Sequence, residues 1–188
     1  MKKEVEILCR LGGTKRTALR KLSALEPVGT KRTVDTYYFD PKRPALRPKK
    51  GRLTECFRLR RQGDGCRLAY KVDHFRRGEW MYSDEHETAV AEADVMEAIV
   101  CRLGLKPLVV VDMVKHLFRS PEYEVAVEEV RSLGLFIEVE SRRAVTEGEV
   151  AAERRRIRAF LSGLGLAVGE EMNSGKPELL LAQKPGKG

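Results

Sequence analysis

The fold is decided by the stretch Glu128–Glu140, which reads Glu-Glu-Val-Arg-Ser-Leu-Gly-Leu-Phe-Ile-Glu-Val-Glu. A turn at residues 133–134 divides it into two half-strands, and the second half alternates strictly between two faces. Side chains two apart in a strand share a face, so Phe136, Glu138 and Glu140 lie together, opposite three aliphatic side chains that must be buried. The carboxylates therefore either line a second, charged surface or face water, as one side of an antiparallel sheet often does.

The same arrangement of carboxylates opens the chain. Residues 3–11 alternate, with Glu4, Glu6, Leu8 and Arg10 at one parity and, after Lys3, aliphatic or thiol side chains at the other. Two glycines end this run at residues 12–13. Acidic side chains thus share one strand face in two distant parts of the chain.

Length and composition indicate one globular domain over residues 1–183, followed by a flexible tail at 184–188. No apolar run approaches the ~20 residues of a membrane span, and the first residues are too charged for a signal peptide. The four cysteines have no CxxC spacing, which favours reduced thiols in a cytoplasmic protein. The net charge of +8 suggests a polyanionic partner, either nucleic acid or a small, highly charged phosphate compound.

Hydrophobic periodicity predicts eight strands, at 3–11, 32–40, 53–61, 67–74, 79–90, 108–118, 122–130 and 135–140. Helices are expected at 15–25, 94–103, 147–164 and 177–183. Residues 41–51 hold three prolines and five basic residues and are expected to form a basic loop. Strands joined by hairpins or across single helices favour an α+β fold. We expect a closed eight-stranded antiparallel β-barrel, a tunnel with flanking helices, because closure removes exposed edges.

The charged faces of these strands differ in sign. Acidic strands carry Glu4, Glu6, Glu138 and Glu140, and basic strands carry Arg58, Arg60, Lys71 and Lys115. If both faced one hollow, the cations would neutralise phosphate oxygens, and the carboxylates would hold Mg²⁺ or Mn²⁺. Each of these residues taken alone also fits a solvated strand face.

The order and spacing of the motifs resemble the CYTH superfamily, the triphosphate tunnel metalloenzymes, over almost the whole chain. This superfamily includes class IV adenylate cyclases and thiamine triphosphatases. The run 4–7 matches the start of its Glu-x-Glu-x-Lys signature, 35–40 resembles its second-strand motif, and Glu85 and Glu87 resemble its central acidic strand. The closest match is 128–140, with Glu128 where the family usually has Asp.

The resemblance implies a divalent-metal-dependent enzyme that hydrolyses or cyclises a triphosphate, such as a nucleoside triphosphate, thiamine triphosphate or tripolyphosphate. The implied metal ligands, for Mg²⁺ or Mn²⁺, are Glu4, Glu6, Glu128, Glu138 and Glu140. The implied substrate-binding residues are Arg10, Arg58, Arg60, Lys71, Lys115 and Glu87. Catalytic roles would fall to Glu6, Lys71 and Arg58. A homodimer is consistent with the family, and no membrane contact is expected.

Three positions depart from the family pattern. Leu8 stands where the signature has lysine, and Met113 where the family often has another. A carboxy-terminal Ser-Tyr pair appears only as Ser174-Gly175. Each departure removes a cation or a positioning group, and electrostatic stabilisation is the main catalytic lever in phosphoryl transfer. Arg10 has the parity to point inward and replace the charge missing at position 8.

Three functional classes therefore remain open. The first is a metal-dependent triphosphatase or class IV adenylate cyclase-like enzyme. The second is a catalytically weakened protein that binds a phosphate compound. The third is a basic RNA-binding protein that uses the loop at 42–52 and the rim Arg154–Arg158, and it requires basic residues clustered on one outer face. The division into acidic and basic strands favours the tunnel, so nucleic acid is the less favoured partner.

Overall fold

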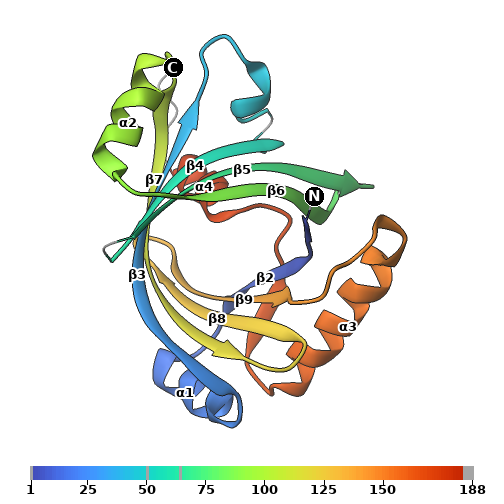
Figure 1. Ribbon diagram of the computed structural model, residues 1–188. Coiled ribbons are helices and arrows are strands. Elements are labelled where there is room, and N and C mark those ends of the chain that lie inside the picture. The colour runs from blue at the N-terminus through green and yellow to red at the C-terminus, as the bar shows by residue number, and fades with distance from the viewer. Residues whose placement is uncertain (1, 50, 64, 184–188) are drawn as a thin grey trace.

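The computed structural model describes residues 2–49, 51–63 and 65–183, which form ten strands and four α-helices with three short 3₁₀ turns (Figure 1). The strands are β1 (Lys2–Glu4), β2 (Glu6–Leu11), β3 (Glu26–Phe39), β4 (Glu55–Gln62), β5 (Gly65–Arg76), β6 (Glu79–Val90), β7 (Lys106–Arg119), β8 (Tyr123–Val130), β9 (Gly134–Ser141) and β10 (Val168–Glu171). The helices are α1 (Lys15–Lys21), α2 (Ala93–Arg102), α3 (Val150–Gly163) and α4 (Lys176–Gln183). The expected tail at 184–188 lies outside the described residues.

All strands belong to one antiparallel sheet in the order β1-β6-β5-β4-β3-β7-β8-β9-β2-β10. β1 and β2 follow each other with only Val5 between them, yet β1 pairs with β6 and β2 pairs with β9. The amino-terminal segment therefore joins the two ends of the curled sheet, and the strands close into a ring (Figure 1). The tunnel architecture and all eight expected strands are confirmed, the first of them divided at Val5.

The additional strand, β10, lies outside this ring and pairs with β2. Its four residues show no alternation in the sequence, so only its tertiary partner makes it a strand. β3 also begins six residues before the expected start at residue 32. Pro27 and Gly29 are unfavourable within a strand, but a register shift in the pairing of β3 with β7 accommodates both.

The hydrophobic core lies mainly between the outer face of the barrel and the helices that cover it. Ile7, Val125 and Val139 are fully or almost fully buried there, and Leu22 and Ile157 from the helical layer belong to the same cluster. Figure 1 shows α1 and α3 along the β2, β8 and β9 wall. Because the apolar parity of each strand faces outward to these helices, the opposite parity is free to carry charge into the hollow.

The helices differ from expectation mainly at their ends. α1 stops at Lys21 and continues as a 3₁₀ turn, and α3 is preceded by a 3₁₀ turn at Glu147–Glu149. A capping box between Thr146 and Glu149 fixes this entry. None of the helices in the described ranges has the length and hydropathy of a membrane-spanning segment.

Candidate functional site

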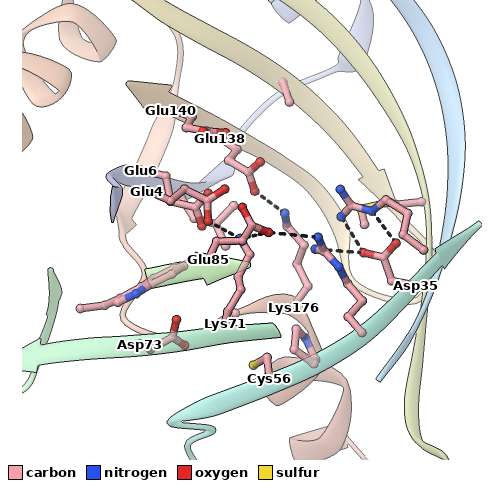
Figure 2. Close-up of a pocket in the computed structure, with 18 of the residues that line it drawn as sticks. Glu4, Glu6, Asp35, Cys56, Lys71, Asp73, Glu85, Glu138, Glu140 and Lys176 are labelled. Atoms are coloured by element: carbon pink, nitrogen blue, oxygen red, sulfur yellow. Dashed lines mark hydrogen bonds and ion pairs between the residues drawn. The ribbon is translucent and has the colours of Figure 1, made fainter. Parts of the chain in front are cut away.

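The hollow of the sheet contains a cavity of about 290 Å³ that is lined mainly by charged side chains. Figure 2 shows carboxylates and cations gathered in it from strands on both walls and from α4. The cavity size is near the lower end for small-molecule sites, ~300 Å³. Most such sites are largely apolar, so this lining indicates a highly charged ligand.

One wall carries a cluster of three carboxylates. One oxygen each from Glu4, Glu6 and Glu140 lies within 4.8 Å of the others, and Glu6 lies directly opposite Glu140 across β2 and β9. Like charges opposite each other destabilise a sheet. Burial, and then the charges of Glu138 and Glu4, raise the pKa of Glu6 well above its ordinary value. Oxygen ligands so arranged fit a hard divalent cation.

Lys71, on β5, connects this cluster to the basic wall. Its ammonium group donates to Glu4 and lies 3.5 Å from Glu85. Burial would lower the pKa of Lys71, but Glu4 and Glu6 outweigh it and raise that pKa well above its ordinary value. Burial likewise raises the pKa of Glu4, yet the charge of Lys71 leaves it below its ordinary value. Lys71 is therefore cationic across the physiological pH range.

The two arginines of β4 are held in place by Asp35 of β3. Arg60 donates two hydrogen bonds of 2.7 Å to the Asp35 carboxylate, and Arg58 lies 3.6 Å from it. Arg58 also lies 3.6 Å from Glu85 and 3.5 Å from Glu87. The Asp35 side chain is completely buried, and the hydrogen bond from Arg60 holds its pKa below the ordinary value against the effect of burial. Asp35 therefore orients both guanidinium groups toward the cavity.

A second group of ions closes the far part of the cavity. Glu128 is fully buried and pairs with Lys115 at 2.6 Å and with Lys176 at 2.5 Å. Glu138 pairs with the same two lysines, at 3.4 Å and 2.6 Å. Burial would raise the pKa of Glu138, but these lysines hold it well below its ordinary value. In the described structure Glu128 and Glu138 thus share two lysines, whereas Glu4, Glu6 and Glu140 form the three-carboxylate cluster, in which Glu4 accepts from Lys71.

Lys176 is a site residue that the sequence did not reveal. It is the first residue of α4, is buried, and reaches the cavity from the carboxy-terminal end of the chain (Figure 2). The expected helix began one residue later, and the residues before it belong to no strand whose alternation could predict a direction. Burial opposes its charge, but Glu128 and Glu138 raise the pKa of Lys176 above its ordinary value.

Arg10 does not line the cavity, contrary to expectation. It has the inward parity, but it is exposed, donates to the carbonyl oxygen of Leu133 at 3.0 Å and lies over the ring of Phe136. Between it and the charges lies an apolar cluster that we call the plug. The plug consists of Leu8, Val111, Met113, Val130, Leu133 and Phe136, with Tyr37, Met172, Leu179 and Leu180 packed against it.

The plug explains two departures from the expected motif. Leu8 and Met113, which stand where cations were expected, are each 2% exposed and belong to this apolar cluster. Both side chains also line the cavity, so they form its apolar border where it meets the plug. The apolar side chains are therefore consistent with their surroundings and give this end of the tunnel a dry wall.

The outer basic rim is largely used in structural ion pairs. Arg154 is 2% exposed and donates to Glu171 and to backbone carbonyl groups. Arg156 pairs with Glu153 and Arg158 with Glu171. Burial lowers the pKa of Arg154 to about 10. These contacts leave few of the rim's cations for a nucleic-acid backbone.

Comparison with known proteins gives one family and several related folds. A family model described as CYTH domain matches residues 2–172. No curated protein sequence matches the chain. Three solved structures share the fold, at sequence identities that establish no more than that. The PH1819 protein of Pyrococcus horikoshii OT3 has a TM-score of 0.81 at 23% identity, covering 96% of this chain and 99% of its own.

The other two carry functional descriptions of their own. A candidate adenylate cyclase of Vibrio parahaemolyticus has a TM-score of 0.78 at 16% identity, covering 96% of this chain and 98% of its own. HpAC1 of Hippeastrum, for which a dominant triphosphatase activity is described, has a TM-score of 0.70 at 15% identity, covering 100% and 98%.

Proposed function

The chain belongs to the CYTH domain family, and from this premise we propose that it binds a triphosphate-containing compound in the tunnel, together with Mg²⁺ or Mn²⁺, and hydrolyses or cyclises it. The observation that carries this proposal is the meeting of six cations with a three-carboxylate cluster in one cavity. The cations are Lys31, Arg58, Arg60, Lys71, Lys115 and Lys176. The triphosphatase activity described for HpAC1, which has the same fold, supports the proposal.

The cations would bind the phosphate chain. The Arg58 and Arg60 guanidinium groups, already oriented by Asp35, would donate paired hydrogen bonds to phosphate oxygens. Lys71 would donate from the adjacent strand, and Lys115 and Lys176 from the opposite side of the cavity. Each of these five cations is paired with a carboxylate in the described structure and would pair with a phosphate oxygen when the ligand binds. The positive charges are therefore in the cavity before the ligand arrives, which keeps the reorganisation small.

The carboxylate cluster would hold the divalent cation. We assign Glu4, Glu6 and Glu140 as its ligands. Glu128 and Glu138 would instead hold Lys115 and Lys176 in place next to the metal site. When bound, the cation would screen phosphate charge and polarise phosphorus–oxygen bonds. A cation would also relieve the repulsion between Glu6 and Glu140, which face each other across the strand pair.

Phosphate release from ATP, thiamine triphosphate and tripolyphosphate, each with Mg²⁺ and with Mn²⁺, tests this proposal. Formation of a cyclic nucleotide from ATP distinguishes cyclisation from hydrolysis. Glu6→Gln should lower the rate of metal-dependent turnover at least ~100-fold, because it removes one of the three carboxylate ligands proposed for the metal. Glu129→Gln is the matched control. Glu129 lies on β8 at the outward parity and pairs with Lys15, so this variant should leave the turnover unchanged. Unchanged turnover in Glu6→Gln would remove Glu6 from the ligands.

A second candidate function is binding of a phosphate compound without fast turnover. The plug favours it, because Leu8 and Met113 place two apolar side chains where the resemblance to triphosphate tunnel enzymes leads one to expect cations. Tight binding of tripolyphosphate by calorimetry, with no product from any of the three substrates, would select this candidate. Measurable phosphate release would exclude it.

A further inference from the structure

One cation of the cavity has no carboxylate of its own. Lys31, on β3, lines the cavity and is partly buried. Within the residues that the structure describes, its ammonium group forms no hydrogen bond and no ion pair. The other five cations of the lining each pair with at least one carboxylate. Lys31 can therefore bind an anion without giving up an existing partner.

The surroundings of Lys31 are mainly positive. It lies directly opposite Lys115 in the pairing of β3 with β7, and like charges in this position destabilise a sheet. Burial, and then the charges of Lys115 and Arg60 on β4, lower the pKa of Lys31 below its ordinary value. Arg67 on β5 acts in the same direction, and only Glu124 on β8 opposes it. An anion bound here would relieve this repulsion.

The strand register places Lys31 at the end of the cavity that is remote from the plug. The inward side chains of β7 run from Met113, which belongs to the plug, through Lys115 to Leu117. Lys31 is level with Lys115, and Lys115 shares its carboxylate partners with Lys176. Figure 2 shows Lys176 reaching the same cavity from α4. Lys176, Lys115 and Lys31 thus form a row of cations that leads outward from α4.

We propose that Lys31 binds the outermost phosphate of the ligand and thereby makes the site selective for a chain of three phosphates over a chain of two. This inference rests on the proposed function and names the residue that measures the length of the chain. A phosphate chain that lies along Lys176 and Lys115 reaches Lys31 with its third phosphate. Contacts with the inner lysines displace carboxylates, whereas the contact with Lys31 displaces none, so a larger share of its charge-assisted hydrogen bond contributes to affinity.

Calorimetric titration with tripolyphosphate and with pyrophosphate, each with Mg²⁺, tests the inference. The wild type should bind tripolyphosphate at least ~10-fold more tightly than pyrophosphate. Lys31→Met should remove most of this preference by weakening tripolyphosphate binding alone, because it deletes the charge and keeps the apolar stem. Lys31→Arg keeps the charge and should retain the preference within ~3-fold. Arg32→Met is the matched control: Arg32 pairs with Asp112 on the outer side of the same strand, so the preference should not change.

The pH dependence of binding separates a direct contact from a structural role. Between about pH 7.5 and 9.5 the wild-type preference for tripolyphosphate should decline as Lys31 loses its proton, whereas Lys31→Arg should keep its preference. Lys71 and Lys176 stay charged over this range, because their carboxylate neighbours raise their pKa values. A preference that is equally independent of pH in both proteins would contradict a contact through the Lys31 ammonium group.

The outcomes distinguish this inference from the proposed function. A wild type that binds both ligands without the preference, or a Lys31→Met variant that loses equal affinity for both ligands or for neither, would overturn the role of Lys31 and leave the proposed function standing. An equal loss of preference in Arg32→Met would also overturn it. A wild type that binds neither ligand would overturn the proposed function, and this inference with it.

Discussion

At the scale of single residues, strand parity predicted which side chains face the cavity but not which partners they find there. Glu4, Glu6, Arg58, Arg60 and Lys71 all line it. Parity fixes a face and says nothing about position along the tunnel. Arg10 therefore shares the inward parity and still lies beyond the plug. Lys176 lies in no strand, so strand parity could not predict that it reaches the cavity, and only the tertiary structure reveals it.

Lys176 gives a residue-scale prediction. Lys176→Met should weaken tripolyphosphate binding ~10- to 100-fold, because one charge-assisted contact to phosphate is lost. Glu128 keeps Lys115 as a partner at 2.6 Å, so the protein should remain folded. Calorimetric titration with Mg²⁺ measures the affinity. Lys15→Met is the matched control, since Lys15 is ion-paired at 2.6 Å on the outer surface. Equal affinity in Lys176→Met and the wild type would place the phosphate chain elsewhere.

At the scale of elements, α4 and the segment before it complete one end of the tunnel. The backbone N–H of Met172 donates to the carbonyl of Leu8, and the N–H of Trp80 donates to the side chain of Asn173. Leu179 and Leu180 pack on the plug. The sequence predicted the helix because its apolar residues repeat. It did not predict where the helix packs, because no local sequence pattern specifies which segment closes one end of the tunnel.

The plug gives a prediction at this scale. Leu8→Lys would restore the charge of the expected signature, but it would replace a plug side chain that is 2% exposed with an ammonium group at the apolar border of the cavity. We expect the free energy of unfolding to fall by about 2–4 kcal/mol, with no gain in phosphate release. Leu8→Met keeps volume and polarity and should cost less than ~1.5 kcal/mol. Urea unfolding measures both. Faster turnover in Leu8→Lys with undiminished stability would contradict the role given to the plug.

At the scale of the whole molecule, the outward core and inward charge explain why the fold was predictable. Most strands show the same alternation, and its apolar phase is satisfied by helices at the outside. Short segments such as β10 were missed because they depend on a neighbour rather than on their own pattern. The net charge of +8 did not by itself identify a ligand, because Arg154, Arg156 and Arg158 of the outer rim pair with carboxylates.

The pH dependence of global stability gives the prediction at this scale. Burial raises the pKa of Glu178 in α4 to about 7, although the carboxylate accepts hydrogen bonds from the N–H groups of Leu53 and Gly175. The ordinary value of 4.5 applies to the unfolded chain. The folded protein therefore binds an additional proton between these values, and this contribution to stability falls as pH rises through about 7.

Glu178→Gln removes this titration. The unfolding free energy of the wild type, measured relative to the variant, should be about 2 kcal/mol higher at about pH 5 than at about pH 8. Chemical denaturation at the two pH values gives the difference. The exposed residue Glu147 offers a control in Glu147→Gln, which should show no such change. A pH-independent difference between wild type and Glu178→Gln would mean that Glu178 is ionised throughout.

The division of the amino-terminal strand at Val5 has a consequence for synthesis. Glu6–Leu11 is synthesised more than a hundred residues before its neighbour Gly134–Ser141. Until then one half of the first strand has no hydrogen-bonding partner, and the ring stays open. Contacts so distant in sequence form slowly. A nascent chain halted before residue 134 thus exposes an unpaired apolar strand, which makes it a substrate for chaperones at that stage.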